Sequence, residues 1–242
     1  MGFTSRKLSS PTFYRLGAAC CAYYVAAQLF QEISFHLGIH DAASGEAEIL
    51  QRLTRFDQFR LILILLGFSV IPIITAYAGV ALRRYQLRPG PSLLGFAFSI
   101  LFVGSEASVR SIDFFLITRR WAVAYQATAL QSVRQAIASR IQVWDDAIAA
   151  FYFALLGVHM LASLCFAVAT WDYDKWDMIV ALGFWVSALE SAGRLAEGYL
   201  GQRWLGHLNN AAYFPVVLFS FGTLGLWLWW QAHSTELRRA SE

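Results

Sequence analysis

The sequence predicts an all-α, polytopic integral membrane protein: a bundle of six transmembrane helices with one further amphipathic helix at the interface. Composition is the first reason, because 57% of the 242 residues are hydrophobic and only 14% are charged, against roughly 45–50% and about 25% in soluble domains. The second reason is that the hydrophobic residues occur in long blocks. A helix of about 20 apolar residues crosses a hydrocarbon core of about 30 Å. Backbone groups in lipid must bond internally, which makes such blocks helical.

Six hydrophobic blocks are the expected spans of a single membrane domain that covers residues 1–242. The first lacks a clear cleavage signal, so it is interpreted as a retained span and not as a signal peptide. Pro89 and Pro91 with Gly90 mark a turn before the third. Pro72 and Pro215 are expected to kink the second and sixth. The spans are expected at 12–37, 59–82, 92–118, 146–170, 177–200 and 211–231.

The longest connection, residues 119–145, carries an amphipathic pattern. Its apolar positions recur at three- and four-residue steps, with Arg134 and Arg140 off that stripe. The pattern predicts a helix that lies along the membrane interface. A helix packed over the end of the bundle is the alternative. The apolar positions are Leu130, Val133, Ile137, Ile141 and Trp144.

The expected location is the plasma (inner) membrane, with both termini in the cytoplasm. The basic residues divide almost evenly between the two sides, so the orientation depends on the earliest loops, which favour an internal N-terminus. Tryptophans are expected to mark the two interfaces. Trp171, Trp176, Trp227, Trp229 and Trp230 would lie at one interface, and Trp121, Trp144 and Trp204 at the other.

A charged triplet occurs twice within hydrophobic surroundings. The pattern E-x-x-x-R-x-x-D lies in the third expected span, and E-x-x-x-R-x-x-E lies in the fifth. The residues are Glu106, Arg110 and Asp113, and, 84 residues later at each position, Glu190, Arg194 and Glu197. A two-helix unit restores the chain direction, so the two triplets would lie at one depth on parallel helices. The pattern favours a duplication of spans 2–3 and 4–5, with coincidence as the alternative.

Charges inside a bilayer must face the interior of the bundle, because each costs roughly 3 kcal/mol at the bilayer centre. The spacing lets Glu106 pair with Arg110, and Glu190 with Arg194. If the two stripes meet, four carboxylates and two guanidinium groups leave a formal charge of −2. Protonation, a bound cation, or water and a further arginine would relieve it, and Arg60 is the candidate arginine.

Polar residues of other spans are expected on the same side. Glu32 and His36 lie four residues apart in the first span, while the opposite halves of the spans are almost wholly apolar. This distribution predicts a funnel that is polar on the side away from the N-terminus and closed at the other end. The expected ligand-binding residues are Glu106, Arg110, Asp113, Glu190, Arg194, Glu197, Arg60, Glu32 and His36. The alternative is a network of ion pairs that only locks the helices together.

Several classes of protein are disfavoured. The sequence has no basic run typical of nucleic-acid binding, and it lacks a Walker loop, a dinucleotide fingerprint and a metal-binding motif. The three cysteines lie in apolar runs and form no disulfide framework. His159 is expected to make an interhelical hydrogen bond, with a metal or haem ligand as the alternative. No cofactor and no metal are therefore predicted.

Two short motifs suggest a relationship. With "DQFRLILILLGF" in the second span and "QRWLGHLNN" before the last, the chain resembles small six-helix bacterial membrane proteins that are grouped as a domain of unknown function. A basic residue similarly opens their second span, and an R-W-L-G-like turn precedes their last, here Arg203 to Gly206. The resemblance implies a membrane location and a six-helix architecture, and it implies no activity.

Three functions are compatible with this pattern. The first is a non-enzymatic carrier or receptor for a small polar or amphiphilic ligand, in which Arg110 and Arg194 hold an anionic group. The second is an enzyme that uses Glu106 or Glu190 as a general acid on a lipid or isoprenoid, with Phe184 and Trp185 as possible walls of a cleft. The third is an accessory subunit of a larger membrane complex. The sequence does not predict the oligomeric state.

Overall fold

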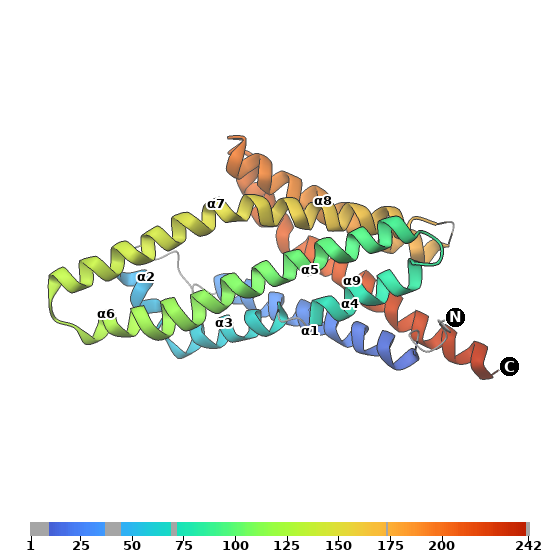
Figure 1. Ribbon diagram of the computed structural model, residues 1–242, viewed down its shortest axis with the longest axis horizontal. Coiled ribbons are helices and arrows are strands. Elements are labelled where there is room, and N and C mark those ends of the chain that lie inside the picture. Colours follow the sequence, from blue (N-terminus) through green and yellow to red (C-terminus); the bar gives the residue numbers. More distant parts are fainter. Residues whose placement is uncertain (1–9, 37–44, 69–71, 173, 241–242) are drawn as a thin grey trace, which may run out of the picture.

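The protein is an elongated bundle of helices (Figure 1). The computed structural model describes residues 10–36, 45–68, 72–172 and 174–240, but not the side chains of residues 35, 36 and 238–240. All regular secondary structure in these ranges is helical. The elements are α1 (Pro11–His36), α2 (Glu46–Gln51), α3 (Arg55–Gly67), α4 (Pro72–Arg84), α5 (Pro89–Ser111), η2 (Ile112–Ala122), α6 (Val123–Ala127), α7 (Gln131–Thr170), α8 (Lys175–Tyr199) and α9 (Leu205–Ala240).

Helices of membrane-spanning length dominate the bundle. By length and composition, five segments within the described residues can cross a membrane: Arg55–Arg84, Pro89–Ala127, Gln131–Thr170, Lys175–Tyr199 and Leu205–Leu237. The first predicted span matches α1, which is 26 residues long but is not among the five. Gln28, Gln31 and Glu32 lower its hydropathy, and all three line an internal cavity.

The second predicted span, 59–82, contains most of α3 and α4. Helix α3 ends at Gly67 and α4 begins at Pro72. Proline lacks a backbone N–H and its ring clashes with the preceding turn, so it is favoured at the first position of a helix. The backbone groups at a helix end need protein around them at membrane depth. Phe68, which caps α3, is accordingly 6% exposed, and it contacts the rings of Tyr24 and Phe102.

The interfacial helix predicted at 119–145 is wrong. Residues 119–127 belong to η2 and α6, which continue from α5, and α7 runs without interruption from residue 131 to residue 170. Two long antiparallel helices therefore project beyond the rest of the bundle (Figure 1). At 1.5 Å per residue α7 is about 60 Å long, twice the thickness of a hydrocarbon core. We call η2, α6 and residues 131–145 the outer arm.

A small core of its own holds the outer arm together. Part of the apolar stripe recognised in the sequence belongs to this core, because Ile137 and Ile141 are buried. Leu130 and Val133 of the same stripe are exposed. Polar contacts fix the base of the arm: Arg52, which follows α2, lies 3.7 Å from Asp145, and Arg119 donates a hydrogen bond of 3.0 Å to Gln58 of α3. The buried members of this core are Ile49, Ile117, Ala122, Tyr125, Ile137 and Ile141.

The end of the bundle opposite the outer arm contains a buried charge network, although an almost wholly apolar half was predicted there. Arg84, which is 3% exposed, forms an ion pair with Asp177 of α8 and lies 3.3 Å from Asp172. The indole of Trp227 donates a hydrogen bond of 2.7 Å to Asp177. Trp227 is thus fully buried and does not belong to the interfacial belt. These contacts join α4, α8 and α9 at the end of the bundle opposite the outer arm.

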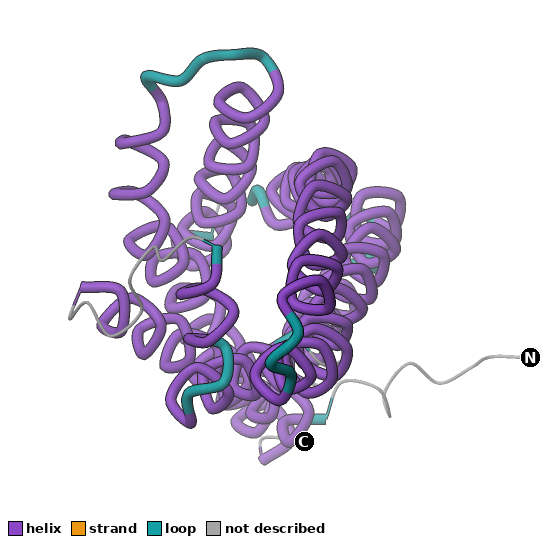
Figure 2. Tube along the Cα trace, turned by 90° about the vertical axis from the view of Figure 1, so that its left-hand side faces the viewer, coloured by secondary structure: helices purple, strands orange, loops and turns teal. Residues whose placement is uncertain are grey.

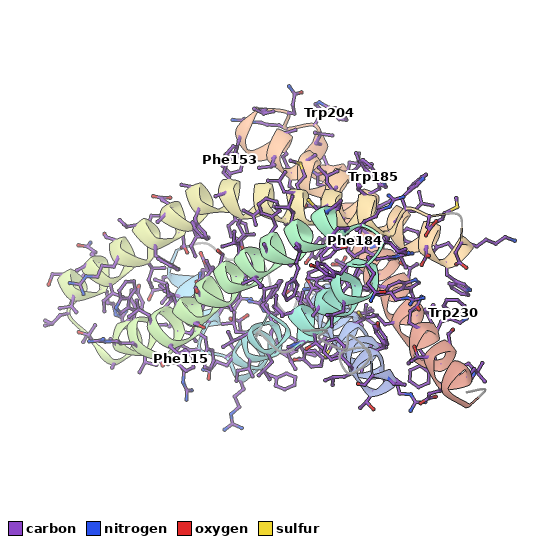
Figure 3. The ribbon with its side chains drawn as sticks, turned by 45° about the vertical axis from the view of Figure 1, so that its right-hand side comes forward. Phe115, Phe153, Phe184, Trp185, Trp204 and Trp230 are labelled. Atoms are coloured by element: carbon purple, nitrogen blue, oxygen red, sulfur yellow. The ribbon has the colours of Figure 1, made fainter. Side chains whose placement is uncertain are left out.

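Large apolar side chains cover the outside of the bundle, as expected for a surface in contact with lipid. Figure 3 shows Trp185 and Phe153 projecting from the helices, with Trp204 at the α8–α9 end. Their exposed fractions are 37%, 54% and 70%. Phe184 instead packs in the core, with its ring 5.2 Å from that of Phe166. Neither Phe184 nor Trp185 lines the internal cavity described below.

Close packing of α5 against α7 depends on a glycine. A Cβ atom added at Gly95 would lie 3.0 Å from the ring of Phe166. Gly104, on the same helix, has no atom within 4 Å of the equivalent position. Overpacking a core costs about 1–3 kcal/mol. We therefore expect Gly95→Leu to lower the thermal unfolding temperature in detergent by several degrees.

Gly104→Leu is the matched control and is expected to leave the unfolding temperature unchanged. Equal destabilisation by the two substitutions would contradict the packing of α5 against Phe166.

Candidate ligand-binding cavity

A cavity of about 890 Å³ lies in the bundle and is lined by residues of α1, α3, α5, α7, α8 and α9. Figure 2 views these helices nearly end-on. The wall is polar toward the outer arm and becomes apolar toward the opposite end. The polar part comprises Gln28, Gln31, Glu32, Glu106, Arg110, Tyr152, Glu190, Arg194, Asn210 and Tyr213. The apolar part includes Ile64, Phe68, Phe102, Leu155, Leu156, Val216, Val217 and Phe221.

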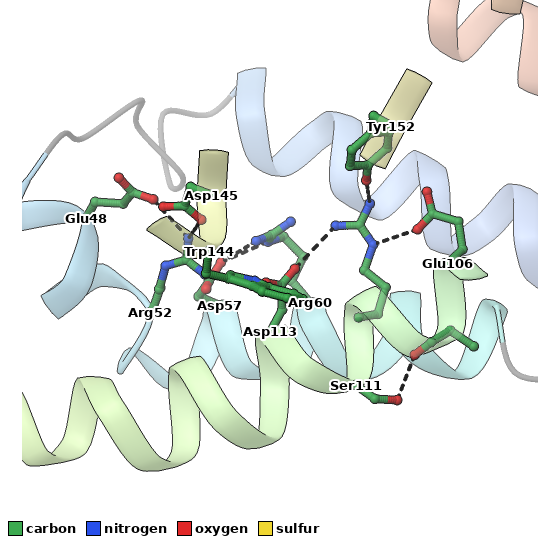
Figure 4. Close-up of polar contacts among 12 residues, drawn as sticks. Glu48, Arg52, Asp57, Arg60, Glu106, Ser111, Asp113, Trp144, Asp145 and Tyr152 are labelled. Atoms are coloured by element: carbon green, nitrogen blue, oxygen red, sulfur yellow. Dashed lines mark hydrogen bonds and ion pairs between the residues drawn. The ribbon is translucent and has the colours of Figure 1, made fainter. Parts of the chain in front are cut away.

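The first Glu–Arg pair is held by α5 and α7. Arg110 donates from Nε to Glu106, at 3.1 Å, and from Nη2 to the hydroxyl of Tyr152, at 2.6 Å (Figure 4). Its Nη1 atom lies 3.8 Å from Asp113. Glu106 is 4% exposed, so its charge depends on Arg110 for compensation. All three nitrogens of this guanidinium group therefore face a partner within the protein.

The second pair lies across the cavity on α8. Arg194 donates from Nε to Glu190, and its guanidinium carbon lies 4.7 Å from the ring centre of Tyr213 on α9. That distance is typical of a cation–π contact. The hydroxyl of Tyr213 donates to Gln28 of α1, at 3.1 Å. Figure 1 shows that α5 and α8 run in the same direction, and α7 packs between them.

His159 lines the cavity from α7. Its Nδ1 atom lies 2.8 Å from the hydroxyl of Ser191 on α8, and that hydroxyl donates to the carbonyl oxygen of Ser187. With the hydroxyl proton used in this way, Nδ1 is the donor of the His159–Ser191 bond. The histidine ring also packs on Phe102, with ring centres 4.4 Å apart. This is the interhelical hydrogen bond expected from the sequence, and no group of metal-binding residues occurs among the described residues.

Several residues predicted for the site lie elsewhere. Asp113, in η2, accepts a hydrogen bond of 3.0 Å from the indole of Trp144, and Glu197 accepts one of 2.6 Å from Asn209. Neither lines the cavity. Arg60, the candidate compensating arginine, forms an ion pair with Asp57 at 2.8 Å (Figure 4) and does not line the cavity. The side chain of His36 lies outside the described residues.

The cavity contains residues that sequence reasoning did not identify. Tyr24 lines it from α1, and Phe68 and Phe221 line its apolar part. The rings of Tyr24 and Phe221 are in contact, tilted by 50° to each other, with ring centres 4.4 Å apart. In the sequence these residues have no feature that separates them from the many other aromatic residues of the spans. Their position follows only from the way the helices pack.

Fold and cavity together define a class: an all-α bundle whose helices are long and apolar enough to cross a membrane, built around an internal, partly charged cavity. Comparison with known proteins adds no name to this class. No family model, no curated protein and no solved structure matches the chain. The resemblance to six-helix bacterial proteins therefore stays an expectation from the sequence.

Proposed function

We propose that this protein is a six-span integral membrane protein that binds one small amphiphilic molecule in its central cavity. It acts as a carrier that later releases this molecule. The observation that carries the proposal is the composition of the cavity wall, charged at one end and aromatic and aliphatic at the other. Its volume of about 890 Å³ lies within the range of small-molecule sites, about 300–1,000 Å³. A molecule with a polar head and an apolar body matches both ends.

The packing of α1 supports six crossings. Near one end of α1, Arg15 forms an ion pair of 2.8 Å with Glu236 of α9, and further along Gln28 accepts from Tyr213 of the same helix. Helix α1 therefore runs antiparallel to α9 over the length that spans the bundle, and it crosses the same layer. With six crossings both ends of the chain lie on one side of the membrane. We place that side in the cytoplasm, so that the polar end of the cavity faces outward.

The hydrogen-bond partners of the two glutamates favour binding over general-acid catalysis. Glu106 and Glu190 each accept a hydrogen bond from an arginine four residues later. Each carboxyl group therefore faces an arginine of its own helix, whereas a general acid has to direct a proton toward the substrate. Both carboxylates thus serve to orient arginines at the cavity wall.

Binding of a neutral probe tests the proposal. The purified protein in nanodiscs is titrated with 1-dodecanol and followed by native mass spectrometry. We expect saturable binding of one dodecanol molecule per chain. Adducts that increase without saturation as the dodecanol concentration rises would contradict the proposal, because that behaviour is typical of partitioning into the lipid.

A further inference from the structure

The two copies of the Glu–Arg motif differ in the partners available to the arginine. Arg110 uses Nε for Glu106 and Nη2 for Tyr152, with Asp113 at 3.8 Å from Nη1. The counterpart of Asp113 is Glu197, and Asn209 holds that carboxylate away from Arg194. Among the described residues, Arg194 has only the bond from Nε to Glu190 and the ring of Tyr213. Its Nη1 and Nη2 atoms keep their hydrogen-bonding capacity.

We infer that Arg194 binds the anionic head of the ligand, and that Arg110 is a structural latch. Two parallel N–H groups of a guanidinium match the two oxygens of a carboxylate or phosphate. The ring of Tyr213 holds the guanidinium plane at the cavity wall, so little side-chain freedom is lost on binding. The inference rests on the proposed function and narrows the ligand to a single-chain carboxylate or phosphate amphiphile.

The charge of the cavity wall raises a competing possibility. Three carboxylates (Glu32, Glu106 and Glu190) face two guanidinium groups there, which by count favours a cation. Each carboxylate, however, already has a partner: Glu106 and Glu190 bind arginines, and Glu32 interacts with another group of the protein. The N–H groups on Nη1 and Nη2 of Arg194 remain available to a ligand, and these positively charged donors favour an anion.

The chain length of the ligand is limited by the apolar part of the cavity. Phe102, Leu155 and Val217 line the wall beyond the charged end. Still farther from the outer arm, beyond these lining residues, the packed rings of Tyr77, Phe166 and Phe184 form a closed floor. A head group at Arg194 directs its chain toward this floor. We therefore use twelve-carbon probes that differ only in their head groups.

Five probes separate the possible ligands: dodecanoate, dodecyl phosphate, 1-dodecanol, dodecylammonium and inorganic phosphate. Affinities are measured by native mass spectrometry in nanodiscs of zwitterionic lipid. In the unmodified protein we expect dodecanoate and dodecyl phosphate to bind at least about tenfold more tightly than dodecanol. Dodecylammonium is expected to bind no more tightly than dodecanol, and inorganic phosphate to bind too weakly to displace dodecanoate.

Variants assign the preference to one arginine. Arg194→Gln is expected to remove the preference for anions while dodecanol still binds. Glu190→Gln is expected to tighten dodecanoate binding, because the competing carboxylate is neutralised. Arg110→Gln should destabilise the fold yet keep the ratio of dodecanoate to dodecanol affinity in the folded fraction. Arg203→Gln, at an exposed position outside the cavity, is the matched control and should leave every affinity unchanged.

The outcomes distinguish two failures. An anion preference that persists in Arg194→Gln overturns the inference while dodecanol binding still supports the proposed function. Tighter binding of dodecylammonium than of dodecanol also overturns it, as does displacement of dodecanoate by inorganic phosphate, which would identify a free anion as the ligand. If no probe saturates, dodecanol included, both the proposed function and the inference fail.

Discussion

Replacing Arg84 with alanine is expected to cost about 3–5 kcal/mol of stability, the penalty for leaving a buried charge uncompensated. Asp177 would lose its ion pair in a site where it is only 8% exposed. Its other contact, the hydrogen bond of 2.7 Å from Trp227, does not supply a positive charge. Thermal unfolding in detergent, followed by intrinsic tryptophan fluorescence, measures the effect.

The neighbouring residue provides the control. Arg83 is exposed on the same turn of α4, so Arg83→Ala should change the unfolding temperature little. A double variant, Arg84→Met with Asp177→Leu, is expected to be more stable than Arg84→Ala because it leaves no buried charge. Equal effects of Arg83→Ala and Arg84→Ala would show that the network does not join α4, α8 and α9 as described.

Replacing Leu156 with tryptophan is expected to abolish binding of a twelve-carbon probe. Leu156 lines the apolar part of the cavity, and the larger side chain would occupy the space that the apolar body of the ligand needs. Because the site is a cavity and not a packed core, we expect folding to be retained. Titration with 1-dodecanol in nanodiscs measures the loss, which we expect to exceed tenfold.

Leu161→Trp is the matched substitution on the outer face of α7. Leu161 is 41% exposed and does not line the cavity, so probe binding should persist in this variant. Retained binding in Leu156→Trp together with a normal unfolding temperature would place the ligand elsewhere on the protein.

Much of the helical architecture could be predicted from the sequence because it depends on hydropathy and local chemistry. The bounds of α1 and α8 agree closely with the blocks at 12–37 and 177–200. The internal pairs Glu106–Arg110 and Glu190–Arg194 could also be predicted, since residues four apart on a helix are neighbours whatever the rest of the chain does. The number of spans was predicted as six, while composition alone identifies five within the described residues.

The features that the sequence did not predict depend on tertiary contacts. The stripe at 130–144 has the same spacing whether its helix lies on a membrane or packs against η2, so the outer arm could not be distinguished from an interfacial helix. Arg84 and Asp177 lie far apart in the sequence, and only the packing of α4 against the α8–α9 pair joins them. Tertiary contacts also determine the positions of Asp113 and Glu197, the last residues of the two triplets. Asp113 accepts a hydrogen bond from Trp144 and Glu197 accepts one from Asn209, and neither lines the cavity.

Under the proposed function, the cavity is a chamber that water reaches from one side of the membrane. Cysteine accessibility in intact membranes tests it, in a background with Cys20, Cys21 and Cys165 replaced by alanine. Val216 lines the cavity and Leu218, two residues later on α9, is 49% exposed on the outer face. We expect Val216→Cys to react with a charged, membrane-impermeant thiol reagent and Leu218→Cys, in lipid at nearly the same depth, to remain unmodified. Modification of Leu218→Cys but not of Val216→Cys would contradict the claim.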